Sequence, residues 1–228
     1  RQHIHANWKL YAENVRDPYH ASLLHLFHTT FGLYRSSQAG GVRTDAANRH
    51  SMLYSIKGSN DDTRDKEVYK DIRTFNAGFT LQDPSLLAGR PEYADPISLV
   101  ILTVFPNLVV QQIANTLAVR QIVTYGPNAF ELVWTHFGYA DDDAEMKKMR
   151  LKQANLIGPA GVISMEDGEA VEIVQRAISG EQNQASYIAM GGSQPSGADH
   201  LVTESSIIGF WEYYQKKVGI SANWKTGE

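Results

Sequence analysis

The sequence of 228 residues contains no cysteine. Its own residues therefore cannot form a disulfide, a thiolate zinc site, a thiol nucleophile or a cysteine-ligated iron–sulfur cluster. Any metal would have to be held by His, Asp or Glu. No run approaches the roughly 20 apolar residues of a transmembrane helix, and the first seven residues lack the apolar stretch of a signal peptide. We therefore expect no membrane association and a cytoplasmic location.

A strong excess of charge is also missing. The chain has 25 acidic and 21 basic residues and a formal net charge of −4. Nucleic acids and anionic membranes select basic surfaces, so neither is an expected partner. The length and the 43% hydrophobic content suit one folded domain over residues 1–228. Because the chain starts at Arg1 without an initiator Met, we expect a fragment cut at a domain boundary.

The middle of the chain is rich in β-branched and aromatic residues separated by short turns. This pattern predicts an antiparallel meander of four strands, over residues 97–105, 108–114, 117–125 and 130–139. Further strands are predicted at 7–11 and 50–57, with a turn at Gly40–Gly41. Helical periodicity predicts helices over 19–30, 141–156, 162–178 and 203–217. Irregular or exposed segments are expected at 59–71, 81–96 and 191–198. The fold class is α+β, with helices packed on one curved antiparallel sheet.

Three histidines fall within one predicted helix, at His20, His25 and His28. On a straight helix, residues three or four apart share a face, so spacing alone favours His25 and His28 as a metal-binding pair. His20 and His25 lie about 140° apart around an ideal helix. They could share a metal only if the helix is irregular or if the metal lies beyond its end. The histidines could equally fill a core or a polar groove.

Two adjacent acids, Glu166 and Asp167, interrupt an otherwise apolar segment. One simple interpretation is an acid facing solvent beside an acid at a helix end. The alternative is that one carboxylate joins two of the histidines. Two imidazoles and one carboxylate with open positions form the facial arrangement of non-haem Fe(II) oxygenases.

At these residues the sequence resembles a known family. Residues 7–20 (NWKLYAENVRDPYH), followed by His25, resemble the start of the catalytic domain of Rieske-type aromatic-ring-hydroxylating oxygenase large (α) subunits. The resemblance continues through 156–161 (LIGPAG), 165–168 (MEDG) and 209–211 (GFW), and so covers essentially the whole chain. It implies a helix-grip (START-like) fold, in which a curved antiparallel sheet surrounds a long helix. It is strongest for members that act on aromatic carboxylates, of the terephthalate, salicylate and anthranilate type.

The resemblance also implies a metal site. His20 and His25 would be the imidazole ligands of a mononuclear Fe(II), in place of the His25/His28 pair, and Asp167 would be the carboxylate ligand. Asp17 matches the family acid that hydrogen-bonds the first iron histidine and links it to the Rieske centre of a neighbouring subunit. A carboxylate on the far imidazole nitrogen would fix the tautomer and orientation of the ring.

Substrate contacts are expected in the predicted strands and near the histidines. Arg120 either points to solvent or holds a substrate carboxylate by a charge-assisted contact, as the matching Arg does in terephthalate-type relatives. A second such Arg would fall near Leu201, and its absence favours a ligand with a single carboxylate. The remaining candidates would lie near the iron or line the pocket: Asn14, His28, Val110, Gln112 and Ile163.

The family's Rieske [2Fe–2S] domain needs two Cys and two His and is absent from this chain, so we expect it before Arg1 in a full-length protein. The resemblance implies hydroxylation with O2 and electrons from NADH, delivered through a reductase. The isolated domain is therefore expected to be inactive. The implied partners are a β subunit, a Rieske ferredoxin or reductase, and other α subunits in an α3 or α3β3 assembly.

Two other functions remain open from the residues. A metal-independent small-molecule-binding module of helix-grip architecture would not need the His20/His25/Asp167 set. A zinc hydrolase could use the same three ligands. However, the sequence shows no separate general base such as the Glu of H-E-x-x-H.

Overall fold

The computed structural model describes residues 1–58, 67, 70–71, 78–180, 195 and 197–220. Within this part of the chain, seven strands form one sheet in the order β1-β7-β6-β5-β4-β3-β2, and each neighbouring pair is antiparallel. The strands are β1 (Gln2–Ile4), β2 (Gly40–Thr44), β3 (Ser51–Ser55), β4 (Leu99–Val104), β5 (Leu108–Ile113), β6 (Thr116–Thr124) and β7 (Phe130–Phe137). The predicted four-stranded meander and the strand near residues 50–57 are confirmed.

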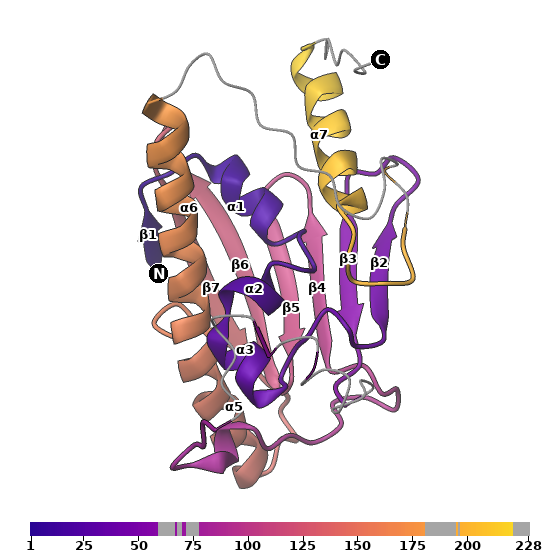
Figure 1. Ribbon diagram of the computed structural model, residues 1–228, viewed down its shortest axis with the longest axis vertical. Coiled ribbons are helices and arrows are strands. Elements are labelled where there is room, and N and C mark those ends of the chain that lie inside the picture. The colour runs from indigo at the N-terminus through magenta and orange to yellow at the C-terminus, as the bar shows by residue number, and fades with distance from the viewer. Residues whose placement is uncertain (59–66, 68–69, 72–77, 181–194, 196, 221–228) are drawn as a thin grey trace.

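The helices lie over one face of this sheet, with α1, α2 and α6 in front of the strands in Figure 1. They are α1 (Trp8–Asn14), α2 (Ala21–Leu24), α3 (Leu26–Phe31), α5 (Ala144–Ile157), α6 (Val162–Gly180) and α7 (Ser205–Val218), with a short 3-10 turn at Pro84–Leu86. The α+β helix-grip prediction is confirmed. The predicted helices at 141–156, 162–178 and 203–217 correspond to α5, α6 and α7, whereas the one at 19–30 is divided into α2 and α3.

Two local predictions are wrong. The strand expected at 7–11 is helix α1, because Asn7 acts as its N-cap and accepts a hydrogen bond from the Lys9 amide at 3.1 Å. The turn expected at Gly40–Gly41 is the start of strand β2. A Cβ at Gly40 would lie 2.3 Å from the Tyr54 carbonyl oxygen, so glycine serves close strand packing there.

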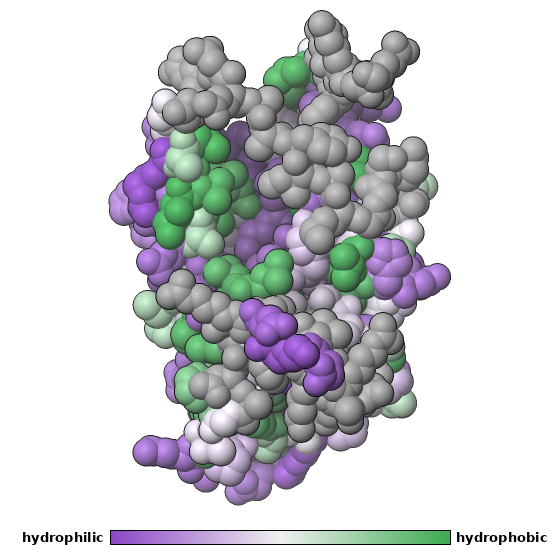
Figure 2. Space-filling model, viewed as in Figure 1, coloured by the Kyte–Doolittle hydropathy of each residue, from purple (hydrophilic) through white to green (hydrophobic). Residues whose placement is uncertain are grey.

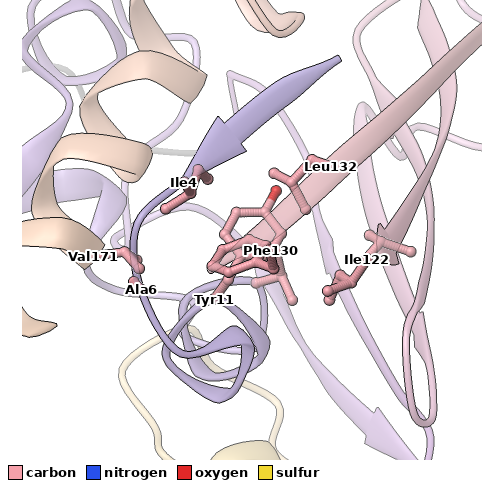
Figure 3. Packing of buried hydrophobic residues seen from close by; sticks show 9 residues of the cluster. Ile4, Ala6, Tyr11, Ile122, Phe130, Leu132 and Val171 are labelled. Atoms are coloured by element: carbon pink, nitrogen blue, oxygen red, sulfur yellow. The ribbon is translucent and has the colours of Figure 1, made fainter. Parts of the chain in front are cut away.

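The core that holds the helices on the sheet is made of large apolar side chains. Tyr11 of α1 and Val171 of α6 pack against Phe130 and Leu132 of β7 and Ile122 of β6, with Ile4 and Ala6 closing the edge (Figure 3). All of these side chains are buried. Burial on this scale is the main stabilising term of a domain. It fixes α1 and α6 beside each other, close to the functional site described below.

The exposed side of α6 carries several apolar side chains among its charged ones. Its exposed side chains include Ile173, Val174 and Ile178, and Figure 2 shows hydrophobic residues gathered over this part of the molecule. No helix in the described residues is long and apolar enough to cross a membrane. The irregular connection expected at 81–96 is confirmed apart from the 3-10 turn. Most of 59–71 and of 191–198 lies outside the described residues.

Candidate metal centre and adjoining cavity

A break in the helical segment after α1 brings the two candidate histidine ligands together. His20 precedes α2, and His25 lies between α2 and α3 with extended backbone angles, φ −88° and ψ 95°. In one continuous helix these side chains would point about 140° apart. Because the helix stops at Leu24 and restarts at Leu26, the two rings approach with centroids 5.4 Å apart.

The third member of the group comes from α6. Oδ1 of Asp167 lies 3.1 Å from Nε2 of His25 and 3.4 Å from Nε2 of His20. Ligand atoms of His20, His25 and Asp167 all lie within 4.8 Å of one another. His28, which spacing alone had favoured as a partner of His25, is not part of this group. The described residues therefore place together the three side chains that the family resemblance had implied.

The far nitrogen of each imidazole is held by another acceptor. Nδ1 of His25 lies 2.8 Å from Oε2 of Glu166, and Nδ1 of His20 lies 2.9 Å from the backbone carbonyl oxygen of Asp17. These contacts favour a proton on Nδ1 and leave both Nε2 atoms facing Asp167. Fixing the tautomer in this way is what metal-binding histidines require.

The Asp17 carboxylate lies near His20, but its shortest contacts are to backbone amides. Its Oδ1 is 3.7 Å from Nδ1 of His20, and it accepts hydrogen bonds from the backbone amides of Tyr19 and His20 at 2.9 and 3.0 Å. The backbone carbonyl oxygen of Asp17 is within hydrogen-bond distance of Nδ1 of His20, and the expected role of the carboxylate stays a prediction. The carboxylate orders the turn that presents His20.

Asn14, at the end of α1, also contacts the group. Its Nδ2 donates to Oδ1 of Asp167 at 3.0 Å and lies 3.3 Å from Nε2 of His20. The side chain is therefore close enough to orient the carboxylate. Figure 1 shows α1 and α6 on the same side of the sheet, and Asn14 and Asp167 join these two helices directly.

The electrostatics of the group follow from burial and from these contacts. Burial opposes the charge on His20, but the nearby carboxylates of Asp167 and Asp17 outweigh it and raise the pKa of His20 to about 10. Burial likewise disfavours the Asp167 carboxylate, yet hydrogen bonds to His20 and His25 hold its pKa well below the usual range. Once a metal displaces the proton from Nε2, two imidazoles and one ionised carboxylate are a donor set that fits Fe(II) or Zn(II).

A cavity of about 60 Å³ adjoins this group. It is lined by the metal-ligand candidates, by apolar side chains of the sheet and helices, and by a few polar ones. The apolar part includes Leu53, Leu99, Ile101, Ile113, Ile157 and Ile163, and the polar part includes Asn14, Asp17, His28, Gln111, Ser164 and Arg120. An apolar cavity with a few polar groups is typical of small-molecule sites.

Arg120 is a buried cation in the cavity wall and does not point to solvent, which was the alternative left open by the sequence. Its side chain is on β6, and the residue is 4% exposed. Nη1 donates to the Tyr11 hydroxyl at 2.5 Å, and the guanidinium lies over the rings of Trp134 and Tyr11 at 4.9 and 5.9 Å. It makes no ion pair with any described residue, and its Nε has no hydrogen-bond partner.

The predicted wall residues are only partly correct. Ile163 and His28 line the cavity, but Val110 and Gln112 do not. Along β5 the side chains alternate between the two faces of the sheet, and Gln111 and Ile113 face the cavity. The residues of β5 predicted to face the cavity therefore differ by one position from those that do. Gln112 instead contacts the carbonyls of Ile97 and Ala114, at 3.4 and 3.5 Å.

His28 lies on the cavity side of His25, and their ring centroids are 5.4 Å apart. Burial is the main cause that lowers the pKa of His28 to about 3, so the ring is neutral. Its Nδ1 has no hydrogen-bond partner in the described structure. A neutral imidazole in this position can contact a ligand in the cavity.

Sequence reasoning missed two residues of the site, Glu166 and Tyr11. Glu166 had been given no role of its own beside Asp167, and Tyr11 had been placed in a strand. A helical assignment for residues 8–14 would have put Tyr11 one turn before Asn14, on the side that meets the sheet. No local signal distinguishes Glu166, since its partner is 141 positions away in the chain.

The fold and the site define a class: a helix-covered antiparallel sheet that presents a buried group of two histidines and one carboxylate beside a small-molecule cavity. Residues 1–206 match the family described as "Ring hydroxylating alpha subunit (catalytic domain)", and the chain belongs to this family.

Similar proteins agree with this assignment. The chain is 51% identical over 222 residues to the alpha 2 subunit of the terminal oxygenase component of terephthalate 1,2-dioxygenase from Comamonas sp. It is 47% identical over 219 residues to the large subunit of anthranilate 1,2-dioxygenase from Burkholderia cepacia. Each match covers 96% of this chain and 52% of the relative, so the chain spans about half the length of these relatives.

The fold also resembles that of a solved structure, naphthalene 1,2-dioxygenase from Rhodococcus sp. bound to indole. The TM-score is 0.64 at 18% identity, over 94% of this chain and 54% of that chain. At this identity the likeness supports the fold alone.

Proposed function

We propose that this chain is the iron-binding catalytic part of an oxygenase that hydroxylates an aromatic carboxylate. The observation that carries the proposal is the His20/His25/Asp167 group beside a cavity that contains the buried guanidinium of Arg120. Membership of the ring-hydroxylating family supports the same reaction class. Bound Fe(II) would supply O2 activation, with electrons from NADH arriving through a reductase and a Rieske [2Fe–2S] centre outside these residues.

The protein's part is to hold the metal in the wall of the cavity. His20, His25 and Asp167 all line the cavity, so an ion held by them would lie beside the bound substrate. Glu166 and the Asp17 carbonyl keep the two rings oriented, and Asn14 orients the carboxylate. Family membership also supports two further proposals. Asp17 would link His20 to the Rieske centre of a neighbouring subunit, and the chain would assemble as α3 or, with a β subunit, as α3β3.

Arg120 would bind the carboxylate of the substrate. A buried guanidinium without an anionic partner is costly, and a bound carboxylate would remove that cost. The apolar wall would pack on the aromatic ring and exclude water from the reacting side.

The substrate is proposed to carry one carboxylate, as salicylate and anthranilate do, rather than two, as terephthalate does. Arg120 is the one Lys or Arg among the described residues that line the cavity. Leu201, the position near which a second Arg was considered, is a fully buried apolar side chain in a cluster with Tyr34, Leu53 and Leu99, which line the cavity, so this position offers no second cation.

Anaerobic Fe(II) titration followed by desalting and metal analysis tests the proposal. The wild-type protein should retain close to one iron per chain. His20→Ala and Asp167→Ala should lose it, and His200→Ala, which removes an exposed imidazole, should retain it. Retention by all variants, or by none including wild type, would refute the site and favour the metal-independent binding module.

A further inference from the structure

Gln111 is a buried polar side chain on the cavity wall that has no hydrogen-bond partner among the described residues. The residue is 2% exposed, and neither Oε1 nor Nε2 of its amide has a hydrogen-bond partner in the described part of the chain. Buried amides in native proteins nearly always have partners, because an unmade bond is costly in a low-dielectric interior. The amide faces the cavity, so a ligand there can complete both of its hydrogen bonds.

The strand register places Gln111 near Arg120. In the β5–β6 ladder Val109 is opposite Arg120, and Gln111 is opposite Ala118. Gln111 and Arg120 are therefore diagonal neighbours on one face of the sheet, for which the typical separation is about 7–8 Å. The Ala118 side chain offers no polar atom to the amide. A small aromatic ligand held by Arg120 is thus within reach of Gln111.

The chemistry of the amide narrows what it can bind. Gln offers one acceptor oxygen and two N–H donors but no charge. A ring hydroxyl or amino group can satisfy such an amide. A second carboxylate would be buried without a second cation among the described lining residues, which is unfavourable.

We propose that Gln111 is a specificity-determining residue that binds a neutral hydroxyl or amino substituent on the ring of an aromatic monocarboxylate held by Arg120. This inference rests on the proposed function, because it uses the same cavity and the same cation. It adds that the site distinguishes a substituted benzoate from benzoate itself.

The test compares the affinities of benzoate and of its three hydroxy and three amino isomers, by anaerobic calorimetry on the Fe(II)-loaded protein. At least one isomer should bind wild type about fivefold more tightly than benzoate, the gain expected of one buried neutral hydrogen bond. Gln111→Met, close in shape but without the amide, should abolish that gain and leave the benzoate Kd within about twofold. Gln112→Met is the matched control, since the neighbouring residue does not line the cavity, and it should keep the gain.

Two further variants distinguish failure of the inference about Gln111 from failure of the proposed carboxylate site. Gln111→Glu would place a carboxylate beside Arg120 and should weaken every ligand of the series by tenfold or more, including benzoate. Arg120→Met should abolish binding of the whole series. The inference is overturned if no isomer gains over benzoate, or if the gain survives in Gln111→Met. Unchanged benzoate affinity in Arg120→Met would instead refute the carboxylate site of the proposed function.

Discussion

Glu166 lies 2.8 Å from Nδ1 of His25, while the next residue along the helix, Asp167, lies 3.1 Å from Nε2 of the same ring. Two consecutive carboxylates of α6 therefore hold one imidazole from both of its nitrogens. The His25 ring is 3% exposed, and the hydrogen bonds outweigh the effect of burial and raise the pKa of His25. The orientation of this ring depends on Glu166, which is not itself a candidate metal ligand.

Replacement of Glu166 should therefore weaken metal binding without removing a ligand. Glu166→Ala is expected to lower Fe(II) affinity about 10- to 100-fold, the usual effect of losing an acceptor behind a metal-binding histidine. Glu169→Ala, which removes an exposed carboxylate from the same helix, should leave the affinity unchanged. Anaerobic competition with a chromophoric chelator measures both, and equal affinities in the two variants would contradict a positioning role for Glu166.

Tyr11→Phe tests the hydrogen bond that supports Arg120. The substitution keeps the buried ring but removes the oxygen that accepts from Nη1 of Arg120. Since a buried hydrogen bond to a charged group contributes about 1.5–3 kcal/mol, the free energy of unfolding should fall by about 2 kcal/mol. Tyr125→Phe removes the hydroxyl of an exposed tyrosine and should change it by less than about 0.5 kcal/mol. Urea unfolding gives both values, and a Tyr11→Phe protein as stable as Tyr125→Phe would exclude this role.

Phe130 should be among the side chains on which the fold depends most. It is fully buried between α1 and the sheet, and its ring centroid lies 5.7 Å from that of Tyr11. Phe130→Ala is expected to lower the free energy of unfolding by about 3–5 kcal/mol, through lost burial and a residual cavity. Phe137→Ala makes the same change at an exposed position of the same strand, and a loss below about 1 kcal/mol is expected. Comparable losses at the two positions would argue against the packing in Figure 3.

Arg150 on α5 forms a second charged cluster, with Glu92 and Asp142, none of which lines the cavity of the proposed substrate site. It donates to Glu92 at 2.6 Å and to Asp142 at 2.7 Å, and the Glu92 side chain is 2% exposed. Arg150→Met would leave Glu92 buried without its cation, so a loss of about 3 kcal/mol in unfolding free energy is expected. Lys152, on the same helix as Arg150, forms a more exposed pair with Asp83, and Lys152→Met should lower the free energy of unfolding by less than about 1 kcal/mol.

The Arg150→Met effect should also depend on pH. The hydrogen bond from Arg150 is the main cause that lowers the pKa of Asp142. A carboxyl with a lowered folded-state pKa stabilises the fold above its unfolded pKa of about 4, and this stabilisation is lost as pH falls through the folded-state value. The difference in stability between wild type and Arg150→Met should therefore shrink as the pH is lowered from 7 towards 2. A constant difference over this range, measured by urea unfolding, would show that Asp142 does not depend on Arg150.

Strand and helix positions were predictable where the sequence pattern is long. Strands β4 to β7 follow β-branched runs with clear turns, and α5 follows an acidic N-terminus that Asp143 caps through the Met146 amide at 2.6 Å. Residues 7–11 were too short for alternation to distinguish a strand from the first turns of a helix. Strand β2 was not predicted, because two consecutive glycines normally mark a turn, whereas here they allow close backbone contact.

The residues of the site were harder to predict from local sequence patterns. The break at His25 has no Gly or Pro to mark it, so spacing on a straight helix favoured His25 and His28, and only the family resemblance pointed to His20. The identity of the cavity-facing residues of β5 was ambiguous for a related reason. In the sequence LVVQQI, the odd-numbered and the even-numbered positions each include apolar and polar residues. Alternation alone therefore could not assign Gln111 rather than Gln112 to the cavity.

The candidate ligands His25 and Asp167 are 142 positions apart in a chain that has no cysteine. An ion bound to both would close a very long loop, and it would restrict the unfolded chain much as a disulfide does. Metal binding would then also stabilise the fold, because it would join the segment of α2 and α3 to α6. Chelation should consequently raise amide hydrogen exchange first in α2 and α3, the shortest helices of the group, while the central strands of the sheet keep their protection.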